Sequence, residues 1–186
     1  MSTRLYTFVG GTNGPWRVTR MQALTGEPLT SIEALDILDG PIIPETRNAG
    51  WLLSGITSNE RYVTRREKQA LVDKQQGLGR PEATCAAFIP IRKNNAWWNL
   101  TQDERREILE EQSRHIGIGL NYLPAIARRL HHCRDLSESQ PFDFLTWFEY
   151  APSDTALFDE LTAELRASHE WSYVDREIDI RLMRAD

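Results

Sequence analysis

The order of strand-like and helix-like segments from residue 83 to residue 183 restricts the fold more than any other feature of the sequence. Residues 83–91 form a continuous apolar run, and "FDFLTWFEY" at 142–150 is rich in aromatic residues; both patterns are typical of strands. Residues 173–183 alternate between apolar and polar side chains, which also predicts a strand. The length of 121–133 fits a helix or a strand, but Pro124 and the alternation after it favour a strand.

Two helical segments separate these strands. Thr101 and Glu104 have capping-box spacing at the start of "TQDERREILEEQSR", and residues 153–168 place their leucines on one side of a helix. Ile108 and His115 are seven residues apart, so we expect them to share one face of the first helix. The order strand, helix, strand, strand, helix, strand predicts an α+β fold, a ferredoxin-like antiparallel sheet with helices on one face.

The N-terminal part has weaker signals. Apolar runs at 5–9 and 50–56 indicate strands, and "GGTNGP" at 10–15 indicates a turn. Thr30 and Glu33 again have capping-box spacing, which predicts a short helix that ends near Leu38, with Pro41 and Pro44 after it. A polar helix is expected at 64–76, ended by "GLGRP".

Composition excludes several classes of function. The 22 basic and 27 acidic residues give a formal charge of −5, which argues against broad nucleic-acid binding. An anionic substrate would need a local positive group. No signal peptide or membrane span is visible, and we expect no membrane partner. Cys85 and Cys133 are too few for a disulfide scaffold, so we expect a cytoplasmic protein.

Motifs for common enzyme classes are missing from the sequence. The four histidines form no HExxH, neither cysteine belongs to a CxxC, and GxGxxG, P-loop and GxSxG patterns do not occur. Single residues must therefore carry any chemistry. By spacing alone, a histidine before glycines, such as His115, is usually a solvated side chain.

One long stretch gives a more specific signal. "IPIRKNNAWWNLTQDERREILEEQSRH", at 89–115, resembles the chlorite dismutase family of haem proteins through its double tryptophan, its charged helix and its final histidine. "AIARRL" at 125–130 is similar to the segment that carries the family's distal arginine, and "SNERYV" at 58–63 to its propionate-binding segment. With 142–150 and the residues around Glu170, the resemblance covers roughly 50–183.

The resemblance implies haem b as the cofactor and His115 as the axial ligand of its iron. Glu170 matches the carboxylate that takes the proton of the ligand's second ring nitrogen. Arg128 would lie on the opposite face of the haem and hold a small oxyanion. The thirteen-residue interval from His115 selects Arg128 over Arg129, which we expect to point the other way and to be exposed.

Further haem contacts follow from the same resemblance. Arg92 is an alternative to Lys93, Gln76 is an alternative to Gln75 beside the distal arginine, and Trp97 and Trp98 fit the core or an interface equally well. The residues implied in cofactor binding are His115, Arg61, Tyr62, Val63, Lys93, Trp97 and Gln75.

The implied activity is the conversion of chlorite to chloride and dioxygen, through ferryl iron and a transient hypochlorite held by Arg128. A haem peroxidase, a coproheme decarboxylase and a non-enzymatic dimeric binding module are the alternatives. Residues 1–80 are too short for a complete ferredoxin-like half, so we expect a truncated N-terminal half, a haem-binding half at 81–186, and one compact unit. This shortness resembles the dimeric branch of the family, which implies a homodimer of the dimeric α+β barrel type.

Overall fold

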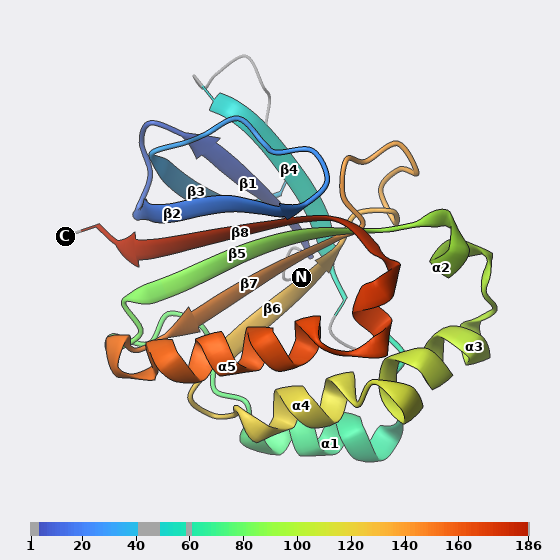
Figure 1. Cartoon of the computed structure of the whole chain (residues 1–186). Helices are drawn as coiled ribbons and strands as arrows, with labels where there is room; N and C mark the ends of the chain where they lie inside the picture. The colour runs from blue at the N-terminus through green and yellow to red at the C-terminus, as the bar shows by residue number, and fades with distance from the viewer. Residues whose placement is uncertain (1–3, 41–48, 59–60, 186) are drawn as a thin grey trace.

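Eight antiparallel strands close into one barrel within the part of the chain that the computed structural model describes, residues 4–40, 49–58 and 61–185 (Figure 1). The order around the barrel is β1-β3-β2-β8-β5-β7-β6-β4. Pro41 and Pro44, and two residues of the segment 58–63, lie outside the described residues. The strands are β1 (Leu5–Gly11), β2 (Trp16–Thr25), β3 (Ala34–Asp39), β4 (Ala49–Thr57), β5 (Cys85–Lys93), β6 (Ala127–His132), β7 (Phe144–Tyr150) and β8 (Val174–Arg184).

The helices gather on one side of the barrel, where α1, α4 and α5 lie below the half formed by β8, β5, β7 and β6 (Figure 1). The expected α+β arrangement is therefore observed, although the sheet as a whole is a closed barrel. The helical elements are α1 (Arg65–Lys74), α2 (Asn95–Asn99), α3 (Gln102–Arg106), the π-helix η2 (Glu107–Gln112), α4 (His115–Asn121), α5 (Thr155–Arg166), and the 3-10 helices η3 (Pro152–Asp154) and η4 (His169–Tyr173).

The two halves of the barrel have the same strand order. In the C-terminal half, the first to fourth strands are β5, β6, β7 and β8, and they lie in the order fourth, first, third, second. The N-terminal strands β1 to β4 follow the same order. Only residues 12–15 separate β1 from β2, so no helix covers this half at that point.

Side chains alternate between two environments along the strands beneath the helices. On β6, Arg128 and Leu130 face the helices and line a cavity there. Arg129 and His131 face the barrel interior, where the Arg129 guanidinium carbon lies 3.7 Å from the Tyr6 ring centre and His131 contacts Phe8. The expectation for the direction of Arg129 is confirmed, but its side chain is half-buried rather than exposed.

The strands and helices expected from residue 83 onward are confirmed in type and order, and so is the helix at 64–76. The strand expected at 121–133 covers only Ala127–His132, because residue 121 ends α4. The helix expected after Thr30 is wrong, because Ala34–Asp39 forms β3 between β1 and β2. The expectation that Ile108 and His115 share a face of one helix is also wrong. Arg114, in the left-handed conformation with φ 54°, ends the first helical stretch, and His115 begins α4.

No helix among the described residues is both long and apolar enough to cross a lipid bilayer.

Candidate functional site

A cavity of about 470 Å³ lies between the helices and the sheet. Its volume is in the range of small-molecule and cofactor sites. The sheet side is mostly apolar, with Ile89 and Ile91 from β5 and Phe144 and Phe148 from β7. All nine residues that sequence analysis placed in the site line this cavity: Arg61, Tyr62, Val63, Gln75, Lys93, Trp97, His115, Arg128 and Glu170.

His115 is positioned by a break in the helical stretch before it. Glu107–Gln112 form a π-helix, and the left-handed Arg114 turns the chain so that α4 starts at His115. Glu110 supports this start, because its carboxylate accepts the backbone N–H groups of Ile116 at 2.7 Å and Gly117 at 3.2 Å. A negative group at a helix N-terminus stabilises the first turn.

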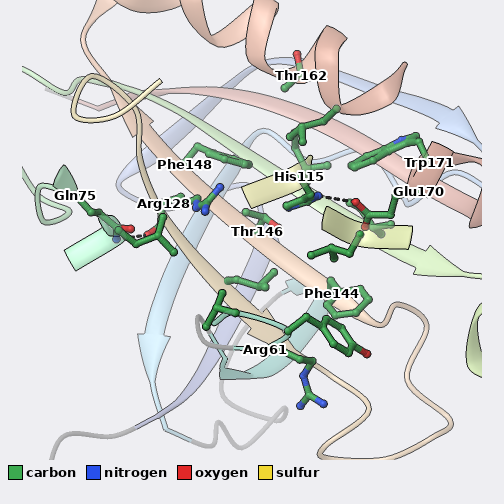
Figure 2. A pocket seen from close by; sticks show the side chains of 18 of the residues that line it. Arg61, Gln75, His115, Arg128, Phe144, Thr146, Phe148, Thr162, Glu170 and Trp171 are labelled. Atoms are coloured by element: carbon green, nitrogen blue, oxygen red, sulfur yellow. Dashed lines mark hydrogen bonds and ion pairs between the residues drawn. The ribbon is translucent and has the colours of Figure 1, made fainter. Parts of the chain in front are cut away.

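The His115 imidazole is held by a buried carboxylate. Its Nδ1 lies 2.6 Å from Oε2 of Glu170 (Figure 2). The other oxygen, Oε1, lies 2.6 Å from Nζ of Lys93. The backbone N–H of Glu170 donates to the Ser113 hydroxyl at 2.8 Å. If Nδ1 carries the proton, Nε2 keeps its lone pair, and within the described residues it has no hydrogen-bond partner. A neutral imidazole in this state is a metal ligand whose basicity the carboxylate raises.

Glu170 and Lys93 form a buried ion pair, with side-chain exposures of 5% and 3%. Burial opposes ionisation of Glu170, but the charges of His115 and Lys93, and the hydrogen bonds that both donate, lower its pKa to about 2. Burial also lowers the pKa of Lys93, and the charge of Glu170 opposes that change. The carboxylate is therefore ionised at neutral pH, and it stays ionised to a lower pH than an ordinary glutamate.

Arg128 reaches from β6 into the cavity and lies to the left of the His115 imidazole in the view of Figure 2. Its guanidinium makes no hydrogen bond or ion pair with any residue that the structure describes. Burial lowers its pKa below the ordinary value, yet a guanidinium remains charged in proteins. An unpaired cation in an apolar cavity is a site for a small anion.

Three polar atoms at another part of the cavity are buried and lack hydrogen-bond partners. They are Nε of Arg61, the hydroxyl of Tyr62 and Nε1 of Trp97, which belong to cavity-lining residues. The Nη2 atom of Arg61 is paired with Asp135 at 2.9 Å. Buried donors are normally paired, so this group points to acceptors supplied by a ligand. Carboxylates such as the propionates of haem match these donors. With an apolar slot and the free Nε2 of His115, the described residues fit a haem group.

The sequence left open which member of two neighbouring pairs, Gln75 or Gln76 and Lys93 or Arg92, lies at the site, and the members of each pair have different contacts in the structure. Gln75 donates to the backbone carbonyl of Arg128 at 3.1 Å, whereas Gln76 accepts from Arg80 at 2.9 Å. Lys93 is buried in the cavity wall. Arg92 pairs with Asp175 at 2.8 Å and is 43% exposed.

The two tryptophans of the double-tryptophan motif have different positions. Trp97 is fully buried in the cavity wall, with its ring under the Lys93 ammonium. The indole of Trp98 donates to Asp143 at 3.1 Å and stacks on Phe144.

Other residues of the site were not predicted from the sequence. Ser113 anchors the backbone of Glu170, and Glu110 caps the helix of His115. Trp171 lines the cavity and donates to the buried Glu177 at 2.8 Å. Ser113 and Glu110 lie within five residues of His115, so their closeness in the sequence could have predicted that they support this histidine. The link between Trp171 and Glu177 has no periodic pattern that would reveal it.

Comparisons with known proteins show the family to which the chain belongs. A family model described as chlorite dismutase matches residues 41–184. A chlorite dismutase of Ideonella dechloratans is 33% identical over an alignment of 126 residues that covers 65% of this chain. The matched region spans only 40% of the length of that relative.

Solved structures give the same result. The structure of dimeric chlorite dismutases from Nitrobacter winogradskyi is similar with a TM-score of 0.88 and 52% identity, over 97% of this chain and 99% of that one. A mutant chlorite dismutase from Candidatus Nitrospira defluvii has a TM-score of 0.71 at 17% identity over 100% of this chain and 93% of that one, which shows a shared fold. The chain therefore belongs to the chlorite dismutase family.

Proposed function

We propose that this protein binds haem b and decomposes chlorite to chloride and dioxygen. The observation that carries the proposal is the set of side chains that line one cavity. It combines an imidazole backed by the buried Glu170, a guanidinium without a partner, and unpaired donors suited to carboxylates. Membership of the chlorite dismutase family supports the same conclusion.

Residues of this chain would hold the haem in three ways. Nε2 of His115 would ligate the iron, because Nδ1 is already directed to Glu170. Arg61, Tyr62 and Trp97 would bind the propionates through their unpaired donors. The apolar side chains of β5 and β7 would cover the porphyrin and exclude water.

The reaction is balanced without a further reductant. Chlorine in chlorite gains four electrons as it becomes chloride, and the two oxygen atoms lose four electrons as they form dioxygen. Bound haem supplies the iron at which a chlorine–oxygen bond can be cleaved. The protein must orient the anion and retain every fragment until the oxygen–oxygen bond has formed.

Arg128 is proposed to perform the retention. Its charge and forked N–H donors suit an oxyanion, and the low polarity of the cavity strengthens their attraction. A transient hypochlorite would be attracted to the guanidinium rather than released to solvent. Glu170, kept ionised, would hold the His115 imidazole in one tautomer and in one orientation.

An oxygen electrode tests the role of Arg128. Haem-loaded Arg128→Ala should release dioxygen from chlorite roughly 100-fold more slowly than the parent protein, with its haem absorbance retained. Arg129→Ala is the matched control, because its guanidinium lies on the opposite face of β6. Full activity of Arg128→Ala would remove this residue from the proposal.

Haem titration followed by absorbance tests the ligand. His115→Ala should lose the spectrum of a histidine-ligated haem, whereas the exposed His169→Ala should keep it. An unchanged spectrum in the His115 variant would exclude axial ligation by this imidazole. Absence of a Soret band in the parent protein after haem addition would refute the proposal as a whole.

We also propose the finer expectations that accompany this function. The shared strand order of the two barrel halves supports a truncated ferredoxin-like half at 1–80 and a haem-binding one at 81–186. Similarity to the dimeric chlorite dismutases of Nitrobacter winogradskyi supports a homodimer. Two free cysteines, Cys85 and Cys133, support a reducing, cytoplasmic location.

A further inference from the structure

The guanidinium of Arg128 rests on the backbone of Gly119. Gly119 is buried in α4, four residues after His115. A β-carbon at position 119 would lie 3.1 Å from both Cζ and Nη2 of Arg128, and closer still to Nη1. Such distances are below ordinary van der Waals contact, so the guanidinium occupies the space that any larger residue at position 119 would need.

Packing, rather than hydrogen bonding, sets the position of this guanidinium. Gln75 binds only the backbone carbonyl of Arg128, and no other described residue pairs with the side chain. Glycine is unfavourable inside a helix relative to alanine. The close approach of Arg128 gives a physical reason for a glycine at this point of α4.

We infer that Gly119 is a positioning residue for Arg128, and that it fixes where the guanidinium stands relative to an anion in the cavity. The inference rests on the proposed function. A methyl group at position 119 would displace the guanidinium from α4 into the cavity. The strand that carries Arg128 would keep its pairing with β7, so the change is confined to the end of one side chain.

Gly117 provides a matched control on the same helix. A β-carbon there would meet Oε1 of Glu110 at 3.5 Å and Cβ of Arg114 at 3.9 Å, which are ordinary contacts. Gly117→Ala and Gly119→Ala therefore add the same methyl group and the same gain in helix propensity. Only the second substitution meets Arg128.

The first test measures fluoride binding by absorbance in the haem-loaded protein. Gly119→Ala should weaken fluoride binding by about tenfold, the effect of a misaligned charge-assisted hydrogen bond, and Gly117→Ala should not. In an Arg128→Ala background, Gly119→Ala should have no further effect. Equal dissociation constants for the two alanine variants, or an effect of the same size without Arg128, would overturn the inference.

The second test uses the haem-free protein, so that it does not depend on the proposed function. Phenylglyoxal modifies arginine side chains, and mass spectrometry gives the rate at each residue. Gly119→Ala should react several-fold faster at Arg128, with Arg129 in the same molecule unchanged and with Gly117→Ala like the parent. An unchanged rate at Arg128 would overturn the inference. A parent protein that fails to bind haem would refute the proposed function alone.

Discussion

Replacement of Glu170 by glutamine should destabilise the folded protein strongly, because it removes the partner of a buried cation. Lys93 is 3% exposed at its side chain, and its Nζ lies 2.6 Å from the Glu170 carboxylate. The amide of Glu170→Gln can still accept the His115 N–H. The substitution therefore tests the charge of the carboxylate rather than its shape.

The magnitude follows from the pKa of Glu170. Lowering that pKa from 4.5 to about 2 corresponds to about 3 kcal/mol of favourable interaction of the ionised carboxylate with His115 and Lys93 together. Loss of one partner from a buried ion pair typically costs about 3–5 kcal/mol. Both routes give a loss of about 3 kcal/mol or more in the free energy of unfolding at pH 7.

Urea unfolding of the haem-free proteins measures this loss. A double variant, Lys93→Met with Glu170→Gln, is the control, because it removes both charges and should recover most of the stability. A loss below about 1 kcal/mol in the single variant, or no recovery in the double variant, would refute the reasoning about the buried pair.

The pH dependence of the same pair has a defined sign. A carboxylate with a lowered pKa in the folded state stabilises the protein above its unfolded pKa. The stabilisation is lost as the pH falls from about 4.5 to about 2. The difference in stability between the parent and Glu170→Gln should therefore shrink across this window.

Three other outcomes are expected. Burial lowers the pKa of His131 to about 4, so protonation of this side chain opposes folding in acid. Its contribution to the free energy of unfolding should fall by about 2 kcal/mol between pH 7.5 and pH 5. The difference in stability between the parent and His131→Asn, measured by urea unfolding, should change by that amount. Glu110→Gln should weaken the first turn of α4 by about 1 kcal/mol, seen as faster hydrogen exchange at Gly117, and unchanged exchange would contradict the capping role. Arg61→Gln should release haem to apomyoglobin about tenfold faster, whereas the solvent-facing Arg92→Gln should not differ from the parent.

The C-terminal half of the fold was predictable because its strands have apolar side chains in a clear pattern. β5 and β7 are buried along almost their whole length, so their sequences are distinctive. β2 was not recognised, because it is mostly exposed and has no such alternation. β3 was predicted as a helix from the spacing of Thr30 and Glu33, and its pairing with β1 and β2 overrode that local signal.

The site was predictable only through family resemblance. His115 and Glu170 are 55 residues apart, and no periodicity links them. The sequence also could not show that the helical stretch before His115 contains a π-helix and ends at a left-handed residue. Arg106, just before the π-helix, pairs with Glu67 at 2.6 Å, and a contact between such distant segments cannot be read from the local sequence.

The pairing of β6 with β7 decides which of two identical side chains becomes the cavity cation. Arg128 lies opposite Phe148, and Arg129 lies opposite Trp147. A one-residue slip of this pairing would exchange the two arginines and leave the overall charge unchanged. Any redesign of the turn at 122–126 must therefore keep the same residues of β6 facing the cavity. Otherwise a protein with the same composition and the same barrel would present Arg129, rather than Arg128, to a ligand in the cavity.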